Sequence, residues 1–319
     1  MGGNEKNKKK MNIMVTGSNG QLGREIRCLA KQSHHSFVFT SRTCLPELEC
    51  HQQLDITDRD AVSKFVSDNS IDVIVNCAAY TKVDDAEYDR DECFLTNFDA
   101  LGYLADAAND NDALLIHISS DYVFSNSAMN EPIGDDEKTS PFGVYSVTKA
   151  LGEALAKSAN KHVILRTAWV YSTFGKNFCK TMMGLMSSKP SLSVVFDQTG
   201  TPTYAGDLAN AVMTVVSDYS ERGLGESSYE NSGIYNYTNE GVCSWYDFAK
   251  MIRFFTGSVC DITPIMSSEL ACKGINPDIR PKYSVLDKTR FKQVFGVTIP
   301  YWVDSLAKCV ETLKCTEKN

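Results

Sequence analysis

The chain has 319 residues, of which 43% are hydrophobic and 23% charged, and its formal net charge is −8. These values are typical of a folded, soluble protein and exclude disordered and fibrous classes, while the acidic balance argues against non-specific binding to nucleic acid. The length predicts one large domain with a smaller lobe rather than three ordinary domains.

Residues 1–10 form a polar, lysine-rich stretch that we expect to be a disordered leader. The apolar run behind it, Ile13–Val15, is too short for an export signal or a membrane span. Eleven cysteines occur without a CxxC pair, which favours reduced thiols and a cytoplasmic location. The five histidines lack metal-ligand spacing with cysteine or acidic residues, so no metal site is predicted.

Short apolar runs alternate with amphipathic segments over the first half of the chain. We expect buried parallel strands at Asn12–Thr16, Ser36–Thr40, Val73–Asn76, Leu114–Ser119 and His162–Thr167. Helical periodicity separates the strands, as in the segment after Asp91, where apolar residues recur on one helical face. This alternation predicts an α/β fold with a Rossmann-type, doubly wound parallel sheet.

The second half has a looser pattern, rich in glycine, proline and aromatic residues, and predicts a smaller α/β lobe. The elements expected in this half of the chain are a helix from Asp207 to about Val216, a strand at Ile234–Thr238, a helix capped by Ser244 and a last helix around Trp302–Leu313. We therefore expect the Rossmann domain to comprise residues 11–168 and 206–232. Residues 169–205 and 233–319 are expected to form the lobe.

Glycines in GxxGxxG spacing follow the first predicted strand and open the first predicted helix. In such a loop Gly17 permits the tight turn, Gly20 lets backbone amides approach a pyrophosphate, and Gly23 allows close helix packing. A glycine-bearing turn without a ligand is the alternative, but the strand–loop–helix context favours a dinucleotide. The predicted cofactor-binding residues of this loop are Gly17, Asn19, Gly20, Gln21 and Leu22.

The second strand is followed by Ser41 and Arg42, where an acid would bind the ribose hydroxyls of NAD. An arginine beside small hydroxyls suits a 2′-phosphate, so the sequence favours NADPH, with NADH as the alternative cofactor. A solvated loop position is the other interpretation of Arg42.

Tyr145 and Lys149 form a YxxxK pair at the start of a helical stretch, and their i, i+4 spacing places both on one face. A tyrosine titrates near 10, so it needs a cation such as Lys149 to act as a proton donor near neutral pH. Such a pair alone is more often a surface feature. Ser120 favours a catalytic pair over a surface pair, because it ends a buried strand at the ligand crevice and can hydrogen-bond a substrate carbonyl.

Five motifs give the chain a wider resemblance. They are GSNGQLG at 17–23, NCAAYTKVDDAE at 76–87, SSDYVF at 119–124, the YxxxK pair and DQTGTPT at 197–203. Together they resemble the dTDP-4-dehydrorhamnose reductase family from Met11 onward. The resemblance implies an NADP(H)-binding Rossmann domain with a sugar-nucleotide-binding lobe, and hydride transfer to the C4 ketone of a dTDP-6-deoxy-4-ketohexose, giving dTDP-L-rhamnose.

The same resemblance implies roles for individual residues. The catalytic set is Ser120, which replaces the family's threonine, with Tyr145 as acid and Lys149 as its partner. Besides the glycine loop, Arg42, Tyr145 and Lys149, the implied cofactor contacts are Asp55, Ile56, Ala78, Ala79, Tyr80 and Asn97. The implied substrate contacts are Ser120, Asp121, Tyr122, Trp169, Asn177, Phe178, Gln198 and Arg280, with Thr201 completing the wall. Asn97 also suits a polar core role, and Trp169 also suits filling of the domain junction.

Some members of the family bind magnesium through glutamates at a dimer contact. Glu25 matches one of these positions, but the others are not placed, so Mg²⁺ stays unassigned and the chain is expected to be a monomer or a homodimer. The expected partner is a dTDP-sugar, with no nucleic acid and no membrane.

Two other classes of function remain open. Nucleotide-sugar epimerases and dehydratases share the glycine loop and YxxxK, but they tend to carry a GGAGFIG-like loop and an acid where this chain has Arg42. A non-catalytic regulatory subunit, similar to the methionine adenosyltransferase beta subunit, is disfavoured because Ser120, Tyr145 and Lys149 are all present.

Overall fold

The structure is a computed structural model, and it describes residues 10–43, 45, 49–125, 130–271 and 280–316. The leader expected at 1–10 lies outside these residues except for Lys10. Among the described helices, none is both long enough and apolar enough to cross a membrane.

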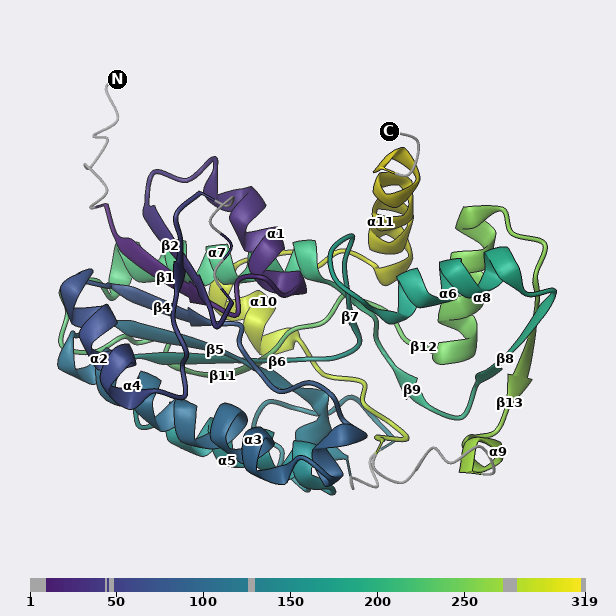
Figure 1. Cartoon of the computed structure of the whole chain (residues 1–319), viewed down its shortest axis with the longest axis horizontal. Coiled ribbons are helices and arrows are strands. Elements are labelled where there is room, and N and C mark those ends of the chain that lie inside the picture. The colour runs from purple at the N-terminus through teal and green to yellow at the C-terminus, as the bar shows by residue number, and fades with distance from the viewer. Residues whose placement is uncertain (1–9, 44, 46–48, 126–129, 272–279, 317–319) are drawn as a thin grey trace.

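A seven-stranded sheet forms the centre of the larger domain (Figure 1). Its strands pair in parallel in the order β3-β2-β1-β4-β5-β6-β11. Their bounds are β1 (Asn12–Thr16), β2 (Ser36–Ser41), β3 (His51–Gln53), β4 (Val73–Asn76), β5 (Leu114–Ser120), β6 (His162–Thr167) and β11 (Gly233–Asn236). The predicted doubly wound α/β fold is confirmed, and β3 is an addition that its short, polar sequence does not signal.

Helices cover both faces of this sheet (Figure 1). One apolar core joins the strands to α1 (Gln21–Ala30), α7 (Ala205–Arg222) and α10 (Thr289–Phe295). The core on the opposite face joins them to α2 (Arg59–Asp68), α4 (Ala100–Asp110) and α5 (Val144–Ala156). Because both faces are covered, the central strands β1, β4 and β6 are largely apolar, as parallel strands in such sheets are.

The strand order reverses between β1 and β4, since the chain runs from β1 outward to β2 and β3 and then returns to place β4 on the other side of β1. In open α/β sheets, ligands bind beyond the carboxyl ends of the strands at such a point. The fold therefore places the crevice next to Thr16 and Asn76, which end β1 and β4.

The predicted helix after Asp91 is interrupted. It consists of α3 (Arg90–Phe94), a π-helical turn at Leu95–Asp99 and α4. Single π-helical turns within α-helices are rare and frequently lie at functional sites. Two 3₁₀ turns lie at Asp85–Glu87 and Asp121–Phe124, and the second contributes Asp121 and Tyr122 to the crevice.

The smaller lobe has its own apolar core. Its helices are α6 (Phe178–Ser188), α8 (Trp245–Thr256), α9 (Ser267–Ala271) and α11 (Trp302–Thr316). Its short strands form three pairs, which are β7 (Val170–Tyr171) with β10 (Thr203–Tyr204), β8 (Ser191–Val195) with β13 (Asp261–Ile265), and β9 (Thr199–Gly200) with β12 (Cys243–Ser244). Ser244 caps α8 as predicted, in a capping box with Asp247.

One boundary of the expected domain division is wrong. It assigned everything after residue 232 to the lobe, whereas β11 pairs with β6 at the edge of the large sheet. The reason is packing, because Tyr235 enters one core of the Rossmann domain and Ile234 packs against the other. Phe291 of α10 joins the first of these cores as well. The rest of the division stays a prediction.

Candidate active site

A cleft of about 790 Å³ opens beyond the carboxyl ends of the sheet strands and extends to the lobe. Most residues predicted for the site line this cleft, although they come from distant parts of the chain. These are Gly17, Asn19, Gly20, Gln21, Leu22, Arg42, Asp55, Ile56, Ala78, Ala79, Ser120, Asp121, Tyr122, Tyr145, Lys149, Trp169 and Asn177.

The glycine loop needs its glycines for steric reasons. Gly17 has a φ of +60°, and a Cβ there would lie 2.5 Å from the backbone nitrogen of Ala78, at the end of β4. A Cβ on Gly23 would lie 2.4 Å from the Cα of Ser18. The loop is therefore packed directly between the next strand and its own helix, which brings its backbone to the floor of the cleft.

The N-terminus of α1 faces the same space. Gly20 is its N-cap and offers no side-chain hydrogen bond to the first turn. The first N–H groups of a helix have no partners within the helix, and they favour an anion at this end. Together with the close-packed glycine loop, this arrangement fits the pyrophosphate of a dinucleotide.

Arg42 lies at the rim of the cleft, just beyond β2, with a side chain 61% exposed. Its guanidinium forms an ion pair with the Glu92 carboxylate of α3. Asn19 and Ser41 lie beside it, joined by a 2.7 Å hydrogen bond from the Asn19 amide to the Ser41 hydroxyl. The rim thus holds the Arg42 cation beside small polar groups, and this cation is already paired with the Glu92 carboxylate.

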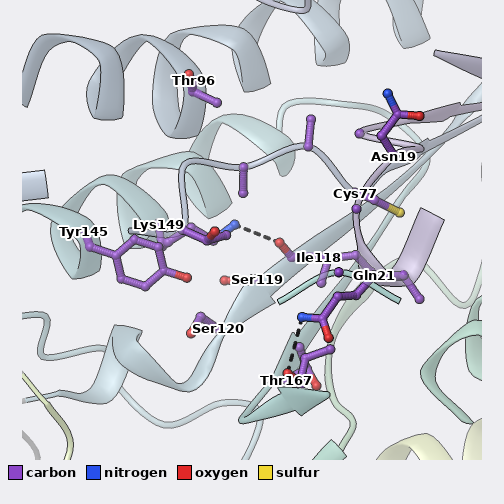
Figure 2. Close-up of a pocket in the computed structure, with 18 of the residues that line it drawn as sticks. Asn19, Gln21, Cys77, Thr96, Ile118, Ser119, Ser120, Tyr145, Lys149 and Thr167 are labelled. Atoms are coloured by element: carbon purple, nitrogen blue, oxygen red, sulfur yellow. Dashed lines mark hydrogen bonds between the residues drawn. The ribbon is translucent and has the colours of Figure 1, made fainter. Parts of the chain in front are cut away.

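Tyr145 and Lys149 lie in the first turns of α5 and are both buried, as is Ser120 at the end of β5 (Figure 2). The Ser120 hydroxyl donates to the Asp121 carboxylate at 3.0 Å and accepts from the Tyr122 N–H at 3.2 Å. Burial raises the pKa of the Tyr145 phenol above its ordinary value, and a hydrogen bond with Ser120 opposes this rise.

Lys149 is 2% exposed, and its Nζ donates to the Ile118 carbonyl at 2.7 Å (Figure 2). A second neighbour is His117, whose Nε2 lies 3.3 Å from the same Nζ. Burial lowers the pKa of Lys149 to about 8. The ammonium is therefore much easier to deprotonate here than on a surface lysine.

Asp121 follows Ser120 and is also buried. Burial raises the pKa of its carboxyl to about 6, and hydrogen bonds, including that from Ser120, act in the opposite direction. With a pKa of about 6, the Asp121 carboxyl is still largely ionised at pH 7. Its oxygens, next to Ser120, can accept hydrogen bonds from hydroxyl groups.

The lobe contributes an aromatic wall. The Trp169 ring stacks on Trp245 with centroids 3.6 Å apart, and Trp169 has a left-handed φ of +49°. Such strain in a non-glycine residue persists only where the surroundings fix it, and it clusters at ligand sites. Trp169 therefore both packs against the core of the lobe and lines the cleft.

Asn177 ties the lobe to the glycine loop. Its amide donates to Gln21 Oε1 at 2.9 Å, and the Gln21 amide donates to the Val170 carbonyl at 3.4 Å. These contacts join the start of α1 to the segment between β7 and α6.

Several predicted site residues are not among the described residues that line the cleft. These are Tyr80, Asn97, Phe178, Gln198, Thr201 and Arg280. The Asn97 amide instead bonds the backbone N–H and carbonyl of Tyr80 at 2.9 and 3.0 Å, which is the polar core role weighed for it. Phe178 packs on Trp245, within the core of the lobe.

The other residues outside the wall have protein partners of their own. The Gln198 amide donates to Ser267, and the Thr201 hydroxyl donates to the Gly241 carbonyl at 2.7 Å. Arg280 pairs with Asp84 at 2.6 Å.

Other cleft residues were not predicted, among them Cys77, Thr96, Thr167, Lys176 and Trp245. The strand-end rule that identifies Ser120 would also have identified Thr167, which ends β6. Trp245 has no such signal, because only the packing of α8 brings it to Trp169.

Glu25 is buried, and its carboxylate accepts a 2.6 Å hydrogen bond from Ser172. Burial raises its pKa, which disfavours the charged form that a metal needs. Among the described residues, no three His, Cys, Asp or Glu side chains cluster as metal ligands. These residues do not fit a magnesium site within this chain.

The cleft joins a dinucleotide-binding end to a proton-donating end, with an aromatic wall beside them. This is the organisation of an NAD(P)-dependent reductase of the short-chain dehydrogenase type.

Comparison with protein-family models matches residues 11–315 to the RmlD substrate binding domain, and the chain belongs to this family. It is 35% identical to a dTDP-4-dehydrorhamnose reductase of Sinorhizobium fredii, over 97% of this chain and 100% of the relative. It is also 31% identical to a dTDP-4-keto-6-deoxy-D-glucose reductase of Streptomyces niveus, over 95% of this chain and 98% of that protein.

Solved structures agree with this assignment. A dTDP-4-dehydrorhamnose reductase of Clostridium acetobutylicum superposes with a TM-score of 0.84 at 37% identity, covering 95% of this chain and 100% of that one. The corresponding enzyme of Bacillus anthracis, solved in complex with NADP, gives a TM-score of 0.83 at 31% identity with the same coverage. The chain is thus an NAD(P)-dependent reductase of the RmlD family.

Proposed function

We propose that this chain uses NADPH to reduce the C4 ketone of dTDP-4-dehydro-L-rhamnose, giving dTDP-L-rhamnose in the last step of dTDP-L-rhamnose biosynthesis. The observation that carries the proposal is that one continuous cleft holds the glycine loop, Arg42, the Ser120–Tyr145–Lys149 set and the Trp169 wall. The relatives named above support the class of substrate.

The proposed chemistry assigns one task to each catalytic side chain. The Ser120 hydroxyl, next to Tyr145, hydrogen-bonds the carbonyl oxygen of the sugar and holds it near the phenol. Tyr145 donates its proton to that oxygen as negative charge develops there. Lys149, as a cation, stabilises the phenolate that remains. Bound NADPH supplies the hydride.

Preference for NADPH is proposed to come from the rim of the cleft. Arg42 can exchange its Glu92 partner for a 2′-phosphate, and Ser41 supplies a small hydroxyl beside it. Asp55 and Ile56 also line the cleft, and they are proposed to border the adenine, as the family resemblance implies.

The sugar is proposed to lie against Trp169, with its ring hydroxyls toward Asp121. Burial keeps Asp121 free of competing water, so hydrogen bonds to hydroxyls there are strong. We propose an indirect role in substrate binding for Phe178, Gln198 and Arg280. Each contacts another residue of the chain, namely Trp245, Ser267 and Asp84, and would hold the surroundings of the sugar in place.

The test is NADPH oxidation by the purified chain, measured by absorbance, with dTDP-4-dehydro-L-rhamnose and with dTDP-4-keto-6-deoxy-D-glucose as a competitor substrate. We expect the highest kcat/KM with the first sugar and no turnover without added NADPH. Turnover without added cofactor would instead indicate an epimerase or dehydratase that retains NAD. Absence of any turnover would favour a non-catalytic role in the cytoplasm, where we expect the protein to act.

A further inference from the structure

His117 lies in the middle of β5 and is completely buried, yet both of its ring nitrogens have polar partners. Its Nδ1 is 3.1 Å from the Asn76 amide nitrogen, and its Nε2 is 3.3 Å from Lys149 Nζ. The proposed chemistry uses Lys149 and gives no task to the histidine.

The orientation of the Asn76 amide is fixed by its other partners. Asn76 Oδ1 accepts from the backbone N–H of Ala78 at 3.2 Å and from the Thr16 hydroxyl at 2.6 Å. A backbone N–H can only donate, so the oxygen of the amide must face Ala78. The amide nitrogen therefore faces His117 and donates to it.

This contact determines where His117 carries its proton. Because Nδ1 accepts from Asn76, it has no proton, and a neutral ring must then carry its proton on Nε2. Burial lowers the pKa of His117 well below its ordinary value, which keeps the ring neutral. The Nε2–H consequently points at Lys149 Nζ.

An ammonium group has three donors and no acceptor, so it cannot pair with a second donor. A neutral amine can accept from Nε2–H with its lone pair while it donates to the Ile118 carbonyl at 2.7 Å. We propose that His117 is a positioning residue that favours the neutral amine of Lys149 over the ammonium, so that Lys149 takes up a proton more readily once it leaves His117 for the cofactor.

The other groups around Lys149 do not reverse this preference. Glu153, one turn further along α5, favours the cation, but its carboxylate is already bonded by Arg166 at 2.9 and 2.8 Å. Cys93 of α3 has a thiol whose pKa is raised by burial, so it carries no charge near neutral pH. Tyr145 also has a raised pKa and is neutral there.

This inference rests on the proposed function only in naming NADPH, and the decisive measurement needs no cofactor. The pKa of Lys149 in the free protein is read from the Cε resonance of protein labelled with carbon-13 lysine, assigned by comparison with Lys149→Met. We expect a value near 8, as burial alone also favours. The variants below separate the histidine from burial.

Two substitutions reverse the polarity of the contact. In His117→Gln the amide is free to turn its oxygen toward Lys149, and in Asn76→Asp the carboxylate accepts from Nδ1–H, which leaves Nε2 as an acceptor. Both variants should raise the pKa of Lys149 by roughly one pH unit or more, as a new hydrogen bond to a charged group would. The basic limb of the kcat/KM profile for NADPH should move to higher pH by the same amount.

His162→Gln is the matched control, because His162 is a partly buried histidine at the start of β6, outside the cleft. It should leave the pKa of Lys149 unchanged. An unchanged pKa in His117→Gln would overturn the proposal, even if Asn76→Asp shifted it, since the added charge alone would explain that shift.

The unmodified protein provides a second measurement should a variant fail to fold. Titration calorimetry of NADPH binding in two buffers of different ionisation enthalpy counts the protons that binding takes up. We expect net uptake from solvent between about pH 8 and 9, where half or more of the free Lys149 is neutral. Binding without uptake over this range would overturn the inference, whereas absence of NADPH binding would refute the proposed function instead.

Discussion

The ion pair between Arg42 and Glu92 makes cofactor preference a quantitative prediction. Replacing Arg42 with alanine removes the cation proposed to face the 2′-phosphate. Hydrogen bonds to charged groups contribute about 1.5–3 kcal/mol, and the 61% exposure of this side chain argues for the lower value. A loss of about 1.5 kcal/mol corresponds to roughly a tenfold fall in kcat/KM for NADPH. The value for NADH should stay within about twofold, on the same scale.

Replacing Glu92, the acid that pairs with Arg42, should change the preference for NADPH in the opposite direction. A 2′-phosphate carries nearly two negative charges, and a carboxylate about 6 Å away repels it by roughly 1 kcal/mol in water. Glu92→Gln should therefore raise kcat/KM for NADPH about fivefold. Both variants are assayed with both cofactors at one sugar concentration, and the ratio of the two kcat/KM values is compared.

Arg59→Ala is the control, because Arg59 is a similarly exposed arginine that forms an ion pair with Asp106, outside the cleft. It should leave the ratio unchanged. If Arg42→Ala reduced kcat/KM for NADPH and NADH alike, the assignment of the 2′-phosphate to this rim would be wrong.

Four further predictions concern the site and its support. Tyr145→Phe should lower kcat by about 10²–10⁴-fold while NADPH binding, followed by fluorescence, is retained, because only proton donation is lost; an intact rate would refute the mechanism. Gly17→Ala forces a Cβ against the β4 backbone and should weaken NADPH binding at least about tenfold, and unchanged affinity would contradict the role of the loop. Glu153→Ala leaves the buried Arg166 guanidinium unpaired, so the free energy of unfolding in urea should fall by about 3–5 kcal/mol; a change below about 1 kcal/mol would show that the pair is not needed. Because burial raises the pKa of Asp121 to about 6, the folded state binds more protons than the unfolded state above the ordinary pKa of 3.8. The stability of the unmodified protein relative to Asp121→Asn should thus be greatest below about pH 4 and should fall as pH rises through about 6, whereas a pH-independent difference would contradict the assigned burial.

The parts of the fold with local signals could be predicted from the sequence. Strands such as Val73–Asn76 and His162–Thr167 are predicted at their observed bounds, because an apolar run between turn residues defines a buried strand. The glycine loop and the YxxxK pair are also local. Ser120 follows from the rule that strand ends face the crevice.

The parts decided by long-range packing could not be predicted. Nothing in the sequence near β11 tells whether that strand joins the large sheet or the lobe, and the expected boundary was wrong there. The partners of the site residues are equally distant in sequence: Glu92 for Arg42, Trp245 for Trp169 and His117 for Lys149. Only the assembled fold shows that the Lys149 amine contacts His117 and the Ile118 carbonyl.

The central claim is that this cleft reduces the C4 ketone of a dTDP-sugar with NADPH. The most direct measurement mixes enzyme, NADPH and dTDP-4-dehydro-L-rhamnose, and follows both NADPH absorbance and the sugar product by chromatography. The account predicts one NADPH oxidised for each dTDP-L-rhamnose formed, with the activity lost in Tyr145→Phe. Formation of a different product, or sugar conversion without NADPH oxidation, would contradict it.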